Sequence, residues 1–172
     1  MYLQGKNRNY LLSFDRARAP YVLSGFVFSI WALCQSVRSV RQMADQALCD
    51  LFSDEKLTEL FSPDRSDRFF DALYGDASDG AYDISLVFKG GDNRSLQFEF
   101  HLNQRPGKCL VCSLTYGLPE VFSRHPIINL KGLSSDIALR LNSGASVKGW
   151  EVGRTIEISS SLHVIPFAVH LE

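Results

Sequence analysis

Apolar and polar residues alternate with a period of two through residues 82–116, and this stretch constrains the fold more than any other. Successive side chains of a β-strand point to opposite faces, so the period indicates strands with one buried face. The first two runs cover residues 82–89 and 96–103, and the glycine-containing residues 90–93 between them are typical of a hairpin turn. A third run covers residues 109–116. The sequence therefore predicts a three-stranded antiparallel meander.

One face of this predicted meander carries only apolar side chains and one cysteine. Burying each large apolar side chain stabilises a fold by roughly 1.5–3 kcal/mol, so we expect helices to cover the face. The preceding segment supplies two short helices. The first follows an N-cap at Ser53, and the second follows Pro63 and has Phe69, Phe70 and Leu73 on its buried side. The apolar face consists of Tyr82, Ile84, Leu86, Phe88, Leu96, Phe98, Phe100, Leu102, Leu110, Cys112, Leu114 and Tyr116.

The segment after the meander predicts one more helix and two strands. Residues 136–142 alternate as in a strand but are flanked by residues typical of helix ends, and the helix is favoured. Residues 147–158 and 162–169 are expected to be strands, with a bulge at Gly153 and with Pro166 placing the last strand at an edge. The predicted fold class is α+β, with N-terminal helices packed on one face of an antiparallel sheet of about five strands.

Length and composition agree with a single domain. Of the 172 residues, 45% are hydrophobic, which suffices for a sizeable core. We divide the expected domain into an N-terminal arm (1–18), a helical part (19–74) and a sheet part (81–170). The formal net charge of −1 provides no basic field, which disfavours nucleic acid as a partner. Four cysteines are few for a disulfide scaffold and favour a reduced, cytoplasmic protein.

Residues 19–37 contain no charged side chain and allow three interpretations. A helix of this length could cross a bilayer as a membrane anchor, and a strand is also compatible with the β-branched and aromatic content. The favoured interpretation is an amphipathic helix, because apolar residues recur at spacings of three and four well beyond the uncharged part. Phe26, Phe28 and Trp31 exceed what one buried face needs, so we expect them to form a binding surface and the protein to be a homodimer.

Cys109 and Cys112 have the spacing of a metal-binding or redox pair. On a strand, however, residues three apart point to opposite faces, so neither a shared metal nor an easy disulfide is expected. We therefore interpret both as structural cysteines and predict no metal site and no cofactor.

The polar face of the meander is the best candidate for catalytic residues. Plausible registers bring Asp83 or Ser85 opposite Glu99 or His101, with Ser113 on the next strand. A carboxylate, an imidazole and a hydroxyl together could support acid–base chemistry. The alternative is an ordinary solvent-facing surface, which the same alternation also produces, and we favour it.

Two further sites involve histidines. Arg124 and His125 precede a proline in a predicted loop and are candidates for binding an anion, although a simple turn is favoured. His163 and His170 lie near the C-terminal predicted strand without partners at metal-ligand spacing, so we expect edge or surface positions for both.

The predicted order of helices, three strands, a helix and two strands resembles the topology of bacterial secretion chaperones, which are small, mildly acidic and dimeric. That resemblance and the surplus apolar surface favour a non-enzymatic module that binds a partner protein or a small apolar ligand in a groove between helix and sheet. The alternatives are a small enzyme using the polar face of the sheet and a domain anchored in the membrane.

Overall fold

The computed structural model describes residues 45–92, 94–113, 115–141 and 144–172. The chain divides into two units, Met1–Arg38 and Ser39–Glu172, and the described residues all belong to the second. The proposed binding residues Phe26, Phe28 and Trp31 lie outside the described residues, as does the candidate membrane segment 19–37.

Short helices precede the first strand, and further short helices separate the second strand from the third along the chain. Tight turns join these elements. Residues 45–51 are helical, and Phe52 follows them into the core. The remaining elements, in chain order, are α2 (Asp54–Leu60), α3 (Asp64–Tyr74), η1 (Ala77–Asp79), β1 (Tyr82–Gly91), β2 (Ser95–Gln104), η2 (Thr115–Gly117), α4 (Leu118–Arg124), α5 (Leu130–Arg140), β3 (Val147–Val152), β4 (Ile156–Ser159) and β5 (Leu162–Leu171).

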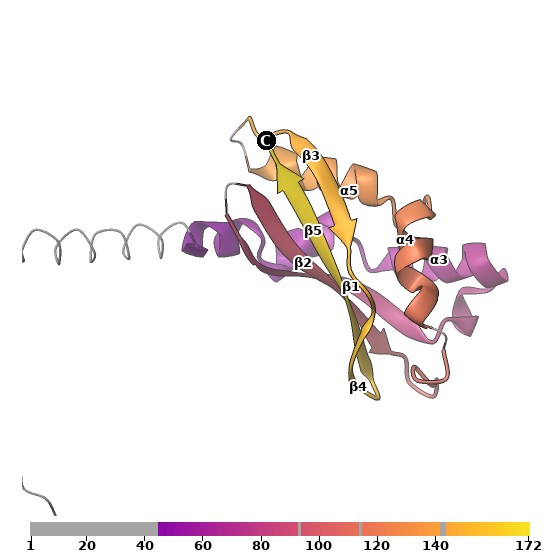
Figure 1. Cartoon of the computed structure of the whole chain (residues 1–172). Coiled ribbons are helices and arrows are strands. Elements are labelled where there is room, and N and C mark those ends of the chain that lie inside the picture. The colour runs from indigo at the N-terminus through magenta and orange to yellow at the C-terminus, as the bar shows by residue number, and fades with distance from the viewer. Residues whose placement is uncertain (1–44, 93, 114, 142–143) are drawn as a thin grey trace, which may run out of the picture. The chain divides into compact units, whose positions relative to one another are not determined.

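The sheet has five strands, all paired antiparallel, in the order β1-β2-β5-β3, and β4 also pairs with β5. The helices α3, α4 and α5 lie together on one side of it (Figure 1). The predicted α+β class is therefore confirmed.

The buried face of the sheet follows from its register. Leu86 pairs with Phe100 of β2, and Phe100 pairs in turn with Ile165 of β5, so large apolar side chains stand side by side across three strands. Phe100 is fully buried and meets the rings of Phe61 and Phe122 edge-on, each at 5.4 Å between centroids. Such edge contacts are a favoured geometry for aromatic rings. The apolar faces expected for β1 and β2 thus form the floor of the core.

Helix boundaries agree with the local signals. Ser53 is the N-cap of α2, α3 begins directly after Pro63, and Gly75 ends α3 in a left-handed conformation with φ of 80°. Phe70 is buried as expected, whereas Leu73 is 42% exposed and does not belong to the buried side.

The prediction of a third meander strand at residues 109–116 is wrong. Residues 109–113 form a turn, and residues 115–117 form η2. The reason is that β5 already occupies the free side of β2, pairing with it from Ser95 to Asn103. The third run therefore cannot pair with β2 as a meander requires, and of its apolar residues Leu110 is buried whereas Tyr116 is 73% exposed.

The expected strand at 147–158 is divided into β3 and β4, and the prediction that Pro166 puts β5 at an edge is wrong. β5 has neighbours on both sides. Gly153 donates its N–H to the Pro166 carbonyl at 2.8 Å, and in an antiparallel strand the N–H and C=O of one residue point to the same side. The nitrogen of Pro166, which carries no hydrogen, therefore faces the break between β3 and β4. No strand pairs there, so the sheet loses no hydrogen bond.

Residues 136–140 are helical, as favoured, within α5. Asn129 caps this helix by accepting the N–H of Gly132. Two strands precede α4 and α5 and three follow them, so the order of elements differs from the one on which the resemblance to secretion chaperones depends.

Candidate functional site: a groove between the helices and the edge strand

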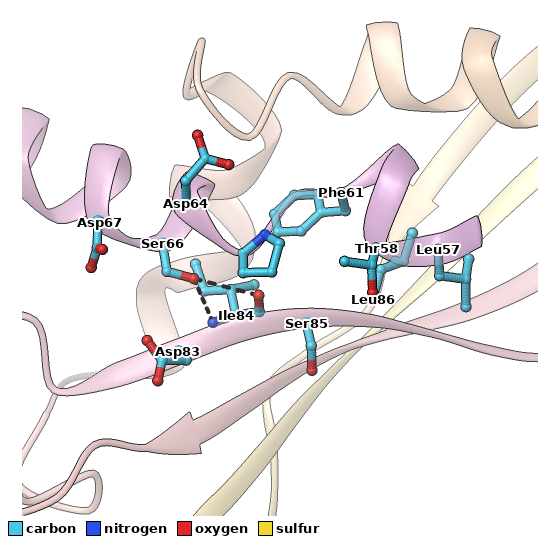
Figure 2. A pocket seen from close by; sticks show the side chains of 11 residues that line it. Leu57, Thr58, Phe61, Asp64, Ser66, Asp67, Asp83, Ile84, Ser85 and Leu86 are labelled. Carbon is cyan, nitrogen blue, oxygen red and sulfur yellow. Dashed lines mark hydrogen bonds between the residues drawn. The ribbon is translucent and has the colours of Figure 1, made fainter. Parts of the chain in front are cut away.

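A groove of about 520 Å³ separates the α2–α3 junction from the outer strand β1. We call it the helix–sheet groove. Leu57 and Phe61 approach it from the helix side, and Ile84 and Leu86 lie on the strand (Figure 2). Its wall is thus mainly apolar at the centre. The lining residues are Leu57, Thr58, Phe61, Pro63, Asp64, Ser66, Asp67, Asp83, Ile84, Ser85 and Leu86.

Ser66 joins the two walls of the groove. Its hydroxyl accepts the N–H of Ile84 at 2.7 Å and lies 3.4 Å from the carbonyl of the same residue (Figure 2). Ser66 is buried in α3, on the same side of the helix as Phe69 and Phe70, three and four positions later. A polar residue in a buried stripe was the sequence signal for this contact, and the sequence interpretation missed it.

The Ser66 contact fixes which groups of β1 point outward. Because the N–H and C=O of Ile84 face α3, alternation places those of Ser85 and Val87 toward β2. The N–H and C=O of Leu86 and Phe88 then point to the outer edge of the sheet. No hydrogen-bond partner for these outward groups is found in the described part of the chain, in which β1 is an edge strand. Unpaired edge groups of this kind can accept another strand.

The end of the groove is acidic. Arg105 donates to Asp83 at 2.8 Å and to Asp67 at 2.5 Å, and also to the carbonyl of Ala77 at 2.8 Å. Burial lowers the pKa of Arg105, but the hydrogen bonds and charges of the two aspartates outweigh it, so the net pKa is raised. Arg105 offsets part of the charge of Asp67 and Asp83, and Asp64 adds a third carboxylate.

The four catalytic candidates are not brought together. Asp83 is held by Arg105 and pairs with Asn103, whereas Ser113 lies in the turn after β2 and donates to the carbonyl of Cys109. The expected position of Ser113 on a neighbouring strand is therefore wrong, because the described residues 109–113 form a turn.

Glu99 and His101 do lie in contact on the open face of the sheet. The Nε2 atom of His101 is 2.9 Å from Glu99, which Lys89 also approaches at 3.4 Å. His101 pairs with Ser85 across the hairpin, one of the registers expected. Neither Glu99 nor His101 lines the helix–sheet groove.

Arg124 and His125 end α4 instead of occupying a free loop. Arg124 is the last residue of α4 and His125 is its C-cap. The His125 ring packs edge-on against Phe69 at 4.8 Å, and burial lowers the pKa of the imidazole. Both residues also line a shallow hollow of about 300 Å³.

The expectation that His163 lies at an edge or on the surface is wrong. It pairs with Leu102 of the interior strand β2, near one end of the β2–β5 ladder, lies on the buried face, and is 3% exposed. Its Nδ1 atom contacts the Thr115 hydroxyl at 2.9 Å, while Thr155 donates to the Thr115 carbonyl at 2.7 Å. These contacts anchor η2 and the start of β4 to β5.

Among the described residues, no cluster of three or more His, Cys, Asp or Glu side chains is placed to bind a metal ion. No helix in the described ranges has both the length and the apolar character needed to span a bilayer. Comparisons with protein families, with curated proteins and with solved structures yield no match to this chain.

Proposed function

We propose that the protein is a binding module that takes up an extended segment of a partner protein in the helix–sheet groove. The segment adds a strand to the outer edge of β1. The observation that carries this proposal is the coincidence of two features: an apolar groove, and a strand edge whose Leu86 and Phe88 backbone groups point outward beside it. Strand addition uses main-chain hydrogen bonds for affinity and side-chain pockets for specificity.

The groove also favours a particular kind of segment. The apolar side chains of Leu57 and Phe61 line the groove, and Asp64, Asp67 and Asp83 form an acidic border. Its charge is offset in part by Arg105, bonded to Asp67 and Asp83, and by Arg68, which lies 3.9 Å from Asp64. Complementary charge favours correct partners and faster association. We therefore expect apolar residues at alternate positions of the bound segment and a lysine or arginine beside them.

Selection from a display library of random linear peptides tests this proposal. Peptides that bind the wild-type protein should carry basic and alternating apolar residues, and they should slow amide exchange at Leu86 and Phe88. Thr58→Trp fills the groove and should weaken the binding of these peptides about tenfold or more, equivalent to about 1.4 kcal/mol.

Ser135→Trp is the matched control. Thr58 and Ser135 are both exposed helical residues, and each hydroxyl donates to the carbonyl four positions earlier, but Ser135 lies on α5 away from the groove. Its replacement should change peptide affinity less than about twofold. Selected peptides that tolerate Thr58→Trp, or that leave the two amides unprotected, would contradict the proposal.

A further inference from the structure

The turn after β2 closes a disulfide between Cys109 and Cys112, with 5.3 Å between the Cα atoms. This overturns the expectation that the two cysteines point to opposite faces. That expectation depended on a strand, and a turn instead brings side chains three residues apart onto one side. The pair therefore meets the geometric requirement for reversible thiol–disulfide chemistry.

Both cysteines are exposed, whereas Leu110 between them is fully buried. Leu110 also donates its N–H to Gln104, and the N–H of Ser113 returns to the Leu110 carbonyl at 2.9 Å. The turn is thus held to the protein by Leu110 and not by the disulfide alone. An exposed disulfide in such a turn can open and close without movement of the core, and exposed disulfides are the ones that exchange readily.

The two sulfur atoms differ in their surroundings. The N–H of Cys112 donates to Sγ of Cys109 at 3.1 Å. A hydrogen bond to sulfur stabilises the thiolate, so Cys109 is the better leaving group when the bond is cleaved. An incoming thiolate is therefore directed to Sγ of Cys112.

A hollow of about 820 Å³ lies at Cys112 and not at Cys109. Phe70 and Leu118 form part of its wall, and Leu73 and Tyr74 are 42% and 62% exposed beside it. An apolar or aromatic residue next to an attacking thiol could be seated here. The sulfur predicted to accept the attack is thus the one with a binding surface next to it.

We infer that Cys109 and Cys112 form a thiol–disulfide exchange site whose partner is a protein dithiol flanked by an apolar or aromatic residue. The first partner thiolate attacks Sγ of Cys112, a mixed disulfide forms, and Cys109 leaves as a thiolate. The second partner thiolate then attacks the partner's own sulfur and releases Cys112 as a thiolate. The partner dithiol is oxidised to a disulfide, the protein disulfide is reduced to two thiols, and no further oxidant is needed.

The first test measures the redox equilibrium of the full chain. The protein is equilibrated with mixtures of reduced and oxidised glutathione, and its free thiols are counted by maleimide labelling. An exchange site predicts that both the dithiol and the disulfide are populated within the glutathione range. A bond that opens only when the protein is unfolded, or cysteines that stay reduced in every mixture, would overturn the inference.

The second test separates exchange from mere exposure. A reduced synthetic peptide with two cysteines and a neighbouring phenylalanine should be oxidised by the wild-type disulfide, one peptide disulfide per protein. With the oxidised peptide, Cys109→Ser should accumulate a mixed disulfide at Cys112 that Cys112→Ser does not form at Cys109 to the same extent. Equal trapping by both variants would contradict the assignment of roles.

Tyr74→Ala tests the hollow. It should slow oxidation of the phenylalanine peptide about threefold or more, while leaving reduction by dithiothreitol unchanged. Tyr116→Ala removes a similarly exposed tyrosine that does not line the hollow and should leave both rates unchanged. Equal rates for the two variants with the peptide would show that the hollow does not bind the partner. These outcomes do not depend on the helix–sheet groove.

Discussion

The hydroxyl of Ser66 in α3 accepts the backbone N–H of Ile84 in β1 at 2.7 Å, and both residues are buried. A side chain of a helix thus takes the place that a neighbouring strand would have on the edge of the sheet. This contact fixes the distance between α3 and β1 and leaves the next outward position, Leu86, open to the groove.

Replacing Ser66 by alanine should therefore destabilise the protein. The change leaves the buried N–H of Ile84 without a partner, and an unsatisfied buried donor costs about 1–3 kcal/mol. Ser134→Ala is the matched control, because Ser134 is also buried in a helix but donates only to the carbonyl of Leu130 in its own helix. We expect a loss below about 1 kcal/mol there. Urea unfolding of both variants measures the difference, and equal losses would contradict this role of Ser66.

Arg105, the residue directly after β2, connects the end of that strand to α3 through Asp67 and to β1 through Asp83. Because both carboxylates are more than half exposed, we expect Arg105→Ala to cost only about 1–2 kcal/mol, part of it from lost packing on Phe70. Arg105→Lys should recover less than half, since lysine cannot make the forked contacts. Arg68→Ala removes an exposed ion pair, in which Arg68 lies 3.9 Å from Asp64, and should change the unfolding free energy by no more than about 0.5 kcal/mol. An equal effect of the alanine variants would contradict the bridging role.

Phe100 contacts Phe61, Phe122 and Phe167 at the centre of the core. Phe100→Ala removes these contacts and should destabilise the protein by about 3–5 kcal/mol. Val111→Ala, at a position 53% exposed in the turn, should cost no more than about 0.5 kcal/mol. Thermal or urea unfolding distinguishes the two. A small effect at Phe100 would mean that the helices do not cover the sheet as described.

His125 should make stability depend on pH in one direction. Burial lowers the pKa of His125 in the folded state, so the unfolded chain binds the proton more readily. Its contribution to stability is fully present above the ordinary histidine pKa of about 6.5 and is lost as pH falls through the lowered folded value. Unfolding free energies measured from about pH 8 to 5 should therefore fall less steeply in His125→Gln than in the wild type. An unchanged slope in His125→Gln would contradict the assignment.

The β1–β2 hairpin could be predicted because its signals are local. Alternation, the glycine-containing turn and the pairing of Ser85 with His101 all depend on residues close in sequence. The place of β5 beside β2 could not be predicted, since period and turn residues do not reveal which distant strand takes an edge. The same limit explains the wrong third strand, the unexpected disulfide and the burial of His163.

The sequence predicts that a groove between helices and sheet exists, but not where it lies. A gap between helices and sheet follows from the fold class, but its position depends on Ser66, whose hydroxyl meets a strand 18 residues away in sequence. The proposed homodimer depended on Phe26, Phe28 and Trp31, outside the described residues, and stays a prediction. Light scattering of the purified protein tests it.

Hydrogen exchange along β1, followed amide by amide by NMR, tests most directly whether this strand offers an open edge. The described contacts predict slow exchange at Ile84, which is bonded to Ser66, and at Ser85 and Val87, which face β2. Fast exchange is expected at Leu86 and Phe88, followed by protection when a selected peptide binds. Slow exchange at Leu86 and Phe88 in the free protein would mean that the edge is already covered, and would contradict the proposed mode of binding.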